Sequence, residues 1–321
     1  MEPIENDPEV RDAVGRALRQ VATADATQPL ERPQHSYIAA ACAYLLGGEA
    51  DVRNARPITA AELAAALPTP ATRERAGDLL TVMPYADATL SPAKVALVGR
   101  FADALGIDGT GVRRRRDVVH PLALAARVHY ARDHRYDWSA QDRIQPVRAR
   151  LREWERGDPH LAARFHALED LHPDTLGRAY IDFCRNRQYP LPGEPGAAPE
   201  SLGLARHDLA HVLTGCDTTP EGEVLLSALL AGNAERDGLL VAAVGLLAAP
   251  EVPPGGTRLP AAADYWAAVA RGAAITAPLA SPTWGPWGQV GRPLDAVREM
   301  LGIGPAPDVV AATPRPLLTA S

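Results

Sequence analysis

The chain has 321 residues, of which 46% are hydrophobic and 22% are charged, as expected of a globular protein that buries a sizeable core. This length is enough for about two domains. The formal net charge of −6 argues against a nucleic-acid binder, because such proteins carry an excess of basic residues. Cys42, Cys184 and Cys216 are widely spaced, which excludes a disulfide framework and a C-x-x-C metal clip.

No targeting segment is visible in the sequence. The first ten residues, MEPIENDPEV, are acidic and lack the apolar stretch of a signal peptide. The longest apolar stretch, from Gly238 to Pro250, is too short to cross a bilayer. We therefore expect a cytoplasmic protein that meets a membrane, if at all, only at its surface.

The first third of the chain is predicted to be helical. Residues 1–33 are expected to form a lead-in with one helix, and residues 34–110 a small helical domain. The sequence HSYIAAACAYLLGG reads as a buried, alanine-rich helix. Capping-box spacing or an N-cap residue before proline predicts three further helix starts, at Thr59, Thr69 and Ser91.

The segment IDGTGVRRRRD interrupts this helical pattern with glycines and the arginine run 113–116. We place the domain boundary here, with the second domain beginning at residue 111. An arginine run at such a place favours a solvated junction, and the alternative is binding of an anionic partner.

Residues 111–303 are expected to form a second helical domain, followed by a flexible tail at 304–321. Proline and glycine exclude regular structure from two loops, 188–200 and 249–260. No alternating strand pattern occurs, so the expected fold class is all-α. The predicted helices are Val118–Arg132, Gln141–Arg156, His160–Leu168, Thr175–Asn186, Leu202–Thr214, Thr219–Arg236, Leu239–Ala248, Ala261–Ile275 and Leu294–Leu301.

The stretch HDLAHVLTGCDTTPEGE, residues 207–223, has the spacing of a metal site. His207 and His211 are four residues apart, so both imidazoles project from one helix face and can bind one metal ion. Asp208 lies about 100° further round the helix and can reach the same ion from the side. A short turn and an antiparallel second helix would bring Glu223 towards His211.

The second helix of this pair is predicted to begin at a capping box of Thr218 and Glu221, which gives Glu221 a structural role. Two nitrogens and two carboxylates then remain as ligands of a divalent metal, zinc first, with manganese, iron or cobalt as alternatives. Cys216 lies in the turn and is expected to be a small buried thiol rather than a ligand. Histidines of an ordinary core or surface are the alternative to a metal site.

The motif HDLAH, followed by eleven residues and Glu223, resembles the H-D-x-x-H-x(11)-E signature of the ubiquinone-biosynthesis protein 4 family, also called coenzyme Q protein 4. Residues 171–193 resemble its L-P-x-x-T-L-G-R-x-Y-x-x-F segment, with His172 in place of the first proline. Residues 265–303 are similar to its closing segment. The resemblance covers residues 118–303, whereas the N-terminal part is distantly similar to the tellurite-resistance protein B-like helical domain.

The resemblance implies an all-α homodimer with an apolar groove for a prenyl chain near the metal. It implies four metal ligands, namely His207, Asp208, His211 and Glu223. It also implies that Arg178 and Tyr180 bind the substrate, because they match the family's Gly-Arg-x-Tyr positions. Arg178 would hold a carboxylate or phosphate group, and a helix-surface ion pair is the alternative.

Family members have been viewed both as scaffolds and as oxidative decarboxylases. We therefore expect a metal-dependent, lyase-type enzyme that decarboxylates, with or without oxidation, a prenylated or polycyclic aromatic carboxylate or phenol. The alternative is a non-catalytic scaffold that binds a lipid or quinone precursor around a structural metal. A third hypothesis is a phosphohydrolase of the His-Asp superfamily, completed by His166 or His172 and by Asp237.

Overall fold

The computed structural model describes residues 7–48, 55–87, 90–133, 157–197, 201–234, 237–248, 260–279, 281 and 284–304. Within these ranges the chain forms thirteen α-helices and no β-strand, so the all-α prediction is confirmed. No helix there combines the length and the apolar character needed to cross a membrane. The predicted helix Gln141–Arg156 and the predicted tail beyond Gly304 lie outside the described residues.

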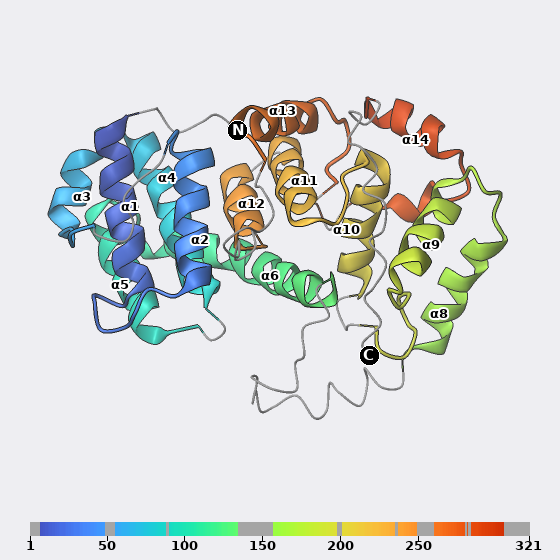
Figure 1. Ribbon diagram of the computed structural model, residues 1–321, viewed down its shortest axis with the longest axis horizontal. Helices are drawn as coiled ribbons and strands as arrows, with labels where there is room; N and C mark the ends of the chain where they lie inside the picture. Colours follow the sequence, from blue (N-terminus) through green and yellow to red (C-terminus); the bar gives the residue numbers. More distant parts are fainter. Residues whose placement is uncertain are drawn as a thin grey trace, which may run out of the picture.

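The N-terminal helices pack together at one end of the molecule (Figure 1). Their local signals were sufficient for prediction, because the capping boxes at Thr59 and Thr69 both form and proline follows Ser91 at the start of its helix. The alanine-rich helix changes to π-helical geometry at Ala41–Leu45. The helices are α1 (Pro8–Ala22), α2 (Arg32–Ala40), α3 (Ala60–Ala66), α4 (Pro70–Val82) and α5 (Pro92–Ala104).

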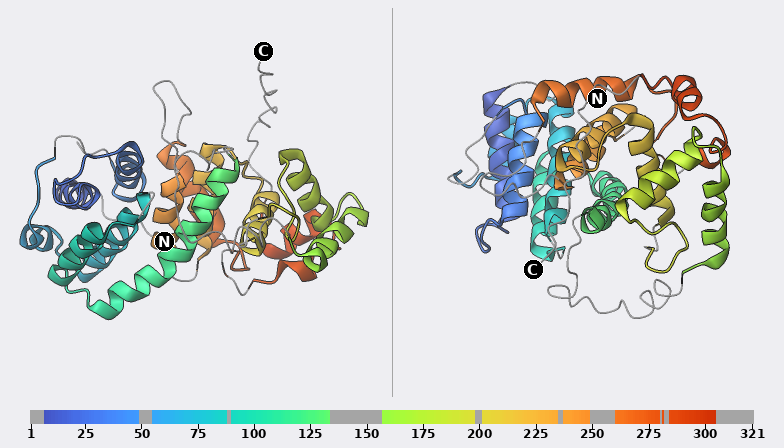
Figure 2. Two further views of the ribbon diagram at one scale, coloured as in Figure 1. Left: turned by 90° about the horizontal axis from the view of Figure 1, so that it is seen from below. Right: turned by 45° about the vertical axis from the view of Figure 1, so that its right-hand side comes forward.

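Helix α6 (Gly109–Asp133) runs from these helices towards the middle of the molecule (Figure 2). It includes residues 109–116, so the predicted interruption is wrong for the arginine run, and the break between α5 and α6 is confined to residues 105–108. Asp108 helps the helix to begin despite its glycines, because the carboxylate accepts a 2.6 Å hydrogen bond from the N–H of Gly111. The division of the chain into two domains at this point stays a prediction.

The second half of the chain contributes α8 (Pro159–His166), α9 (Leu176–Arg187), α10 (Ser201–Thr214), α11 (Pro220–Asn233), α12 (Gly238–Gly245), α13 (Ala262–Ala273) and α14 (Leu294–Leu301). Helices α11, α12 and α13 lie in the middle of the molecule, between the N-terminal helices and α8–α10 (Figure 1). Helix α12 packs against both α4 and α6. The two halves of the chain therefore share a packed interface.

Helices α11 and α13 approach each other so closely that backbone meets backbone. A Cβ atom added at Gly232 would lie 1.9 Å from the carbonyl oxygen of Val269. One added at Gly272 would lie 1.8 Å from the carbonyl oxygen of Leu229. Only glycine fits at either position, because any side chain would push the two helices apart.

Asn233 fixes the same end of α11. Its side-chain amide donates hydrogen bonds to the carbonyl oxygens of Ile275 and Ala277, at 3.2 and 2.8 Å. Its side-chain oxygen accepts a 2.7 Å hydrogen bond from the N–H of Leu279. This buried amide therefore ties the end of α11 to the segment that follows α13.

Candidate metal centre

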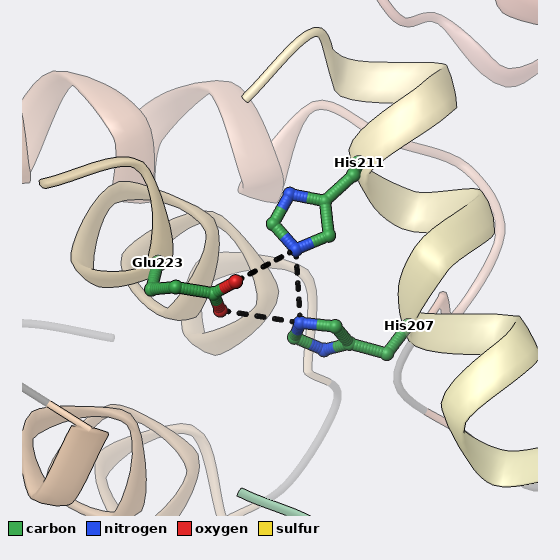
Figure 3. A group of neighbouring side chains, drawn as sticks. All are labelled: His207, His211 and Glu223. Carbon is green, nitrogen blue, oxygen red and sulfur yellow. Dashed lines mark hydrogen bonds and ion pairs between the residues drawn. The ribbon is translucent and has the colours of Figure 1, made fainter. Parts of the chain in front are cut away.

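Three side chains from two helices converge on one point, His207 and His211 of α10 and Glu223 of α11 (Figure 3). Their ligand atoms all lie within 4.8 Å of one another. The Nε2 atoms of the two histidines are 3.0 Å apart. Glu223 places Oε2 3.3 Å from Nε2 of His207 and Oε1 3.1 Å from Nε2 of His211. Two imidazole nitrogens and a carboxylate of this kind are a ligand set that zinc uses in enzymes.

The spacing of four residues on α10 presents the two imidazoles as predicted. Their ring centroids are 4.8 Å apart, and the rings meet edge to face. In Figure 3, α11 is seen nearly along its axis, whereas α10 runs in the plane of the picture. The ligands therefore meet where the two helices cross, which differs from the antiparallel pair that we expected.

Helix α11 begins one residue later than the predicted capping box requires, so that prediction is wrong. The N-cap is Thr219, whose hydroxyl accepts a 3.1 Å hydrogen bond from the N–H of Gly222. Pro220 explains the shift, because proline fits the first helical position, where a backbone N–H would have no partner in the helix. Glu221 therefore does not cap the helix, and Glu223 still lies in its first turn.

The charge of Glu223 is set by its two histidine neighbours. Burial by itself raises the pKa of this carboxyl, but His211 and His207 together lower the pKa well below its ordinary value. The first turn of α11 favours the anionic form further, because the N-terminal end of a helix carries a partial positive charge. Glu223 is therefore a carboxylate at neutral pH, which is the form that binds a metal.

The ring of His211 is held by a hydrogen bond on its far side. Its Nδ1 lies 3.0 Å from the carbonyl oxygen of Cys216. A carbonyl oxygen only accepts hydrogen bonds, so Nδ1 carries a proton, and Nε2 is the ring nitrogen that faces Glu223 and can bind a metal ion. Cys216 thus contributes its backbone. Its side chain is half-buried rather than buried as predicted, and desolvation raises the pKa of its thiol.

Two residues of α9 that the sequence analysis did not single out support the same imidazole. The ring of Phe183 stacks on that of His211, with centroids 5.8 Å apart and planes 20° apart. The guanidinium carbon of Arg187 lies 4.0 Å from the centroid of Phe183, and its Nε donates to the hydroxyl of Thr218 at 3.2 Å. The spacing of four residues between Phe183 and Arg187 is the signal that could have identified this pair.

The remaining predicted ligand, Asp208, is not among the three residues that the structure brings together. It is almost fully buried, at 1% exposure, on the same helix as the histidines. Its role as a fourth ligand stays a prediction.

The two predicted substrate-binding residues lie on α9, outside the cluster. Arg178 forms an ion pair with Asp182 at 2.9 Å and donates to the carbonyl oxygen of Glu169 at 3.1 Å, as in the helix-surface alternative. Tyr180 is 1% exposed and packs against the rings of Phe165 and Trp287. Their contact with a substrate stays a prediction.

The residues named for the phosphohydrolase hypothesis have other partners. His166 lies within 3.3 Å of Glu169, and His172 lies 2.5 Å from Asp174. Asp237 pairs with Arg114 at 2.5 Å. None of the three completes the metal cluster.

Comparisons with known proteins add no relative to this picture. Neither the models of protein families nor the curated proteins contain a match to the chain.

Proposed function

We propose that the chain is a metal-dependent, lyase-type enzyme, related to the ubiquinone-biosynthesis protein 4 family, that acts on a prenylated or polycyclic aromatic carboxylate or phenol. The observation that supports it is the cluster of His207, His211 and Glu223. Structural zinc sites use four protein ligands, whereas catalytic zinc sites use three and keep a position open. A group of three therefore favours catalysis.

The residues present fit a divalent metal, because an ionised carboxylate and the Nε2 atoms of two imidazoles face the same point. When bound, the metal supplies Lewis-acid polarisation of a carboxylate or phenolate oxygen of the substrate. The chain's own part is to hold the ligands still. Cys216 and Phe183 fix the ring of His211, and the start of α11 fixes Glu223.

The alternative function is a lipid-binding scaffold around a structural metal. Such a site would be closed by a fourth protein ligand, and Asp208 is the residue that would supply it. Asp208 follows His207 in the sequence and is buried, and this observation supports the alternative.

The test combines metal analysis with turnover of a prenylated hydroxybenzoate by the full chain. We expect one metal ion per chain and release of carbon dioxide from the wild type, with both lost in His211→Ala. Glu221→Gln is the matched control, because this neighbouring glutamate lies outside the cluster. Bound metal without turnover of any aromatic carboxylate would favour the scaffold, and a wild type that binds no metal would reject both functions.

A further inference from the structure

A second polar site lies at the start of α6, beside the turn Met83–Ala86 that follows α4. It is a cavity of about 280 Å³. None of its lining residues belongs to the helices that carry the metal ligands. The lining consists of Tyr85, Arg113, Arg116, Asp117 and His120.

The four consecutive arginines of α6 fall into two pairs with different surroundings. Arg114 pairs with Asp237 at 2.5 Å. Arg115 is 2% exposed and pairs with Asp78 at 2.6 Å and with Glu74. These two arginines are therefore neutralised by carboxylates of the chain itself.

The other two arginines line the cavity and lack such partners. Among the described residues, Arg113 contacts only the hydroxyl of Thr110, at 3.2 Å, and Arg116 has no hydrogen bond or ion pair. Asp117 also lines the cavity, and within the part of the chain that the structure describes it forms no ion pair with Arg113 or Arg116. The exposed side chains of both arginines thus line the cavity without a carboxylate partner in this described part of the chain.

The spacing brings these groups to one side of the helix. Arg113, Arg116 and His120 are three and four residues apart, which places them on one face of α6. Tyr85 approaches that face from the turn after α4, and its ring meets the ring of His120 edge to face, with centroids 6.2 Å apart. Two arginines, a tyrosine and a histidine therefore line one cavity.

We propose that this cavity binds the phosphate group of a small phosphorylated molecule. Arginine forks match the oxygens of a phosphate group, and charge-assisted hydrogen bonds of this kind are the strong ones. Two arginines and one aspartate give the lining a net charge of +1, which attracts a phosphate group, and the imidazole of His120 offers a further polar group. The carboxylate of Asp117 repels a phosphate group, so its removal should strengthen binding, whereas removal of either arginine should weaken it.

The proposal is tested by calorimetric titration of the full chain with inorganic phosphate and with ribose 5-phosphate. A bound metal could itself bind phosphate, so the titrations are made in the His211→Ala background as well as in the wild type. We expect one site per chain in both backgrounds. Arg113→Gln and Arg116→Gln should each weaken binding roughly tenfold or more, because each removes a charge-assisted hydrogen-bond donor.

Two further variants separate this site from general attraction of anions. Arg114→Gln is the matched control, since it removes the same charge from the same helix outside the cavity and should leave binding unchanged. Asp117→Asn should tighten the binding of inorganic phosphate. Circular dichroism and thermal melting confirm that each variant folds.

A third arm uses vesicles that contain phosphatidic acid. Vesicle binding that is lost in both Arg113→Gln and Arg116→Gln supports the same phosphate chemistry with a lipid as its source. The proposal is overturned if neither soluble phosphate at millimolar concentration nor the vesicles bind to the wild type. Equal binding by the wild type, Arg114→Gln and Arg116→Gln overturns it as well.

Discussion

Two clusters of titratable side chains, each built around one fully buried member, invite comparison. One surrounds Arg115 between α6 and α4, and the other surrounds His211 between α10 and α11. In the first, the guanidinium group of Arg115 donates to the carboxylates of Asp78 and Glu74, so donors meet acceptors. In the second, the Nε2 atom of His211 faces the Nε2 atom of His207 and a carboxylate, three groups that can all accept a proton or bind a metal ion. The first is complete as it stands, whereas the second is completed by a proton or a metal ion. The matched charges around Arg115 therefore indicate a structural role, whereas the convergence of His207, His211 and Glu223 indicates a binding site.

The largest effect is expected from removal of a histidine. His207→Ala or His211→Ala should abolish stoichiometric metal binding, because each deletes one of two nitrogen donors. Elemental analysis after dialysis measures this directly. Full metal occupancy in both variants would show that the cluster is not the metal centre.

Removal of the arginine tests the structural cluster. Arg115→Ala should lower the free energy of unfolding by about 3 kcal/mol, the low end for a buried pair, because it leaves the partly buried carboxylate of Asp78 without its partner. The matched control is Arg114→Ala on the exposed side of the helix, which should cost less than about 1 kcal/mol. Urea denaturation measures both, and equal losses would contradict the distinction between the two arginines.

The two glutamates at the start of α11 sharpen the comparison further. Glu223→Gln should weaken metal binding more than about 100-fold, beyond the range typical of residues that only orient a ligand. Glu221→Gln should leave metal affinity unchanged, because this residue lies outside the cluster. Competition with a metal-binding dye measures both affinities. The opposite ranking would mean that the wrong glutamate has been assigned to the site.

The pH dependence of stability reports on the structural cluster. Burial raises the pKa of Asp78 to about 6, and the neighbouring Arg115 offsets this only in part. In the folded protein Asp78 therefore holds its proton up to about pH 6, whereas in the unfolded chain it releases the proton near pH 4. The resulting contribution to the free energy of unfolding is complete below about pH 4. It should be lost as the pH rises from about 4 to 6, at a cost of roughly 2–3 kcal/mol.

Urea denaturation across this range should show the loss in the wild type. The variant Asp78→Asn lacks the titrating group, so its stability should not contain this step. A wild-type curve that instead rises between pH 4 and 6 by the same amount would mean that Arg115, rather than burial, dominates the titration of Asp78.

The parts of the fold that depend on neighbours in sequence could be predicted. Helix starts at Thr59 and Thr69 follow from local capping, and the two histidines follow from helical periodicity. The burial of Arg115 depends on Asp78, 37 residues away, and the stacking of Phe183 on His211 joins two helices. Such contacts depend on tertiary packing, which a pattern along one segment does not contain.

The close crossing of α11 and α13 fixes the position about which α11, and with it the candidate metal ligand Glu223, could tilt. Gly232 lies nine residues after Glu223, which is about 13 Å along the helix axis. A tilt of about 5° at this position would displace the carboxylate by about 1 Å, whereas metal–ligand distances tolerate only about 0.2 Å. Two residues without any side chain, Gly232 and Gly272, therefore set the tolerance of a site that they never touch. Substitutions at Gly232 and Gly272 should consequently weaken metal binding, although both residues lie far from the ligands.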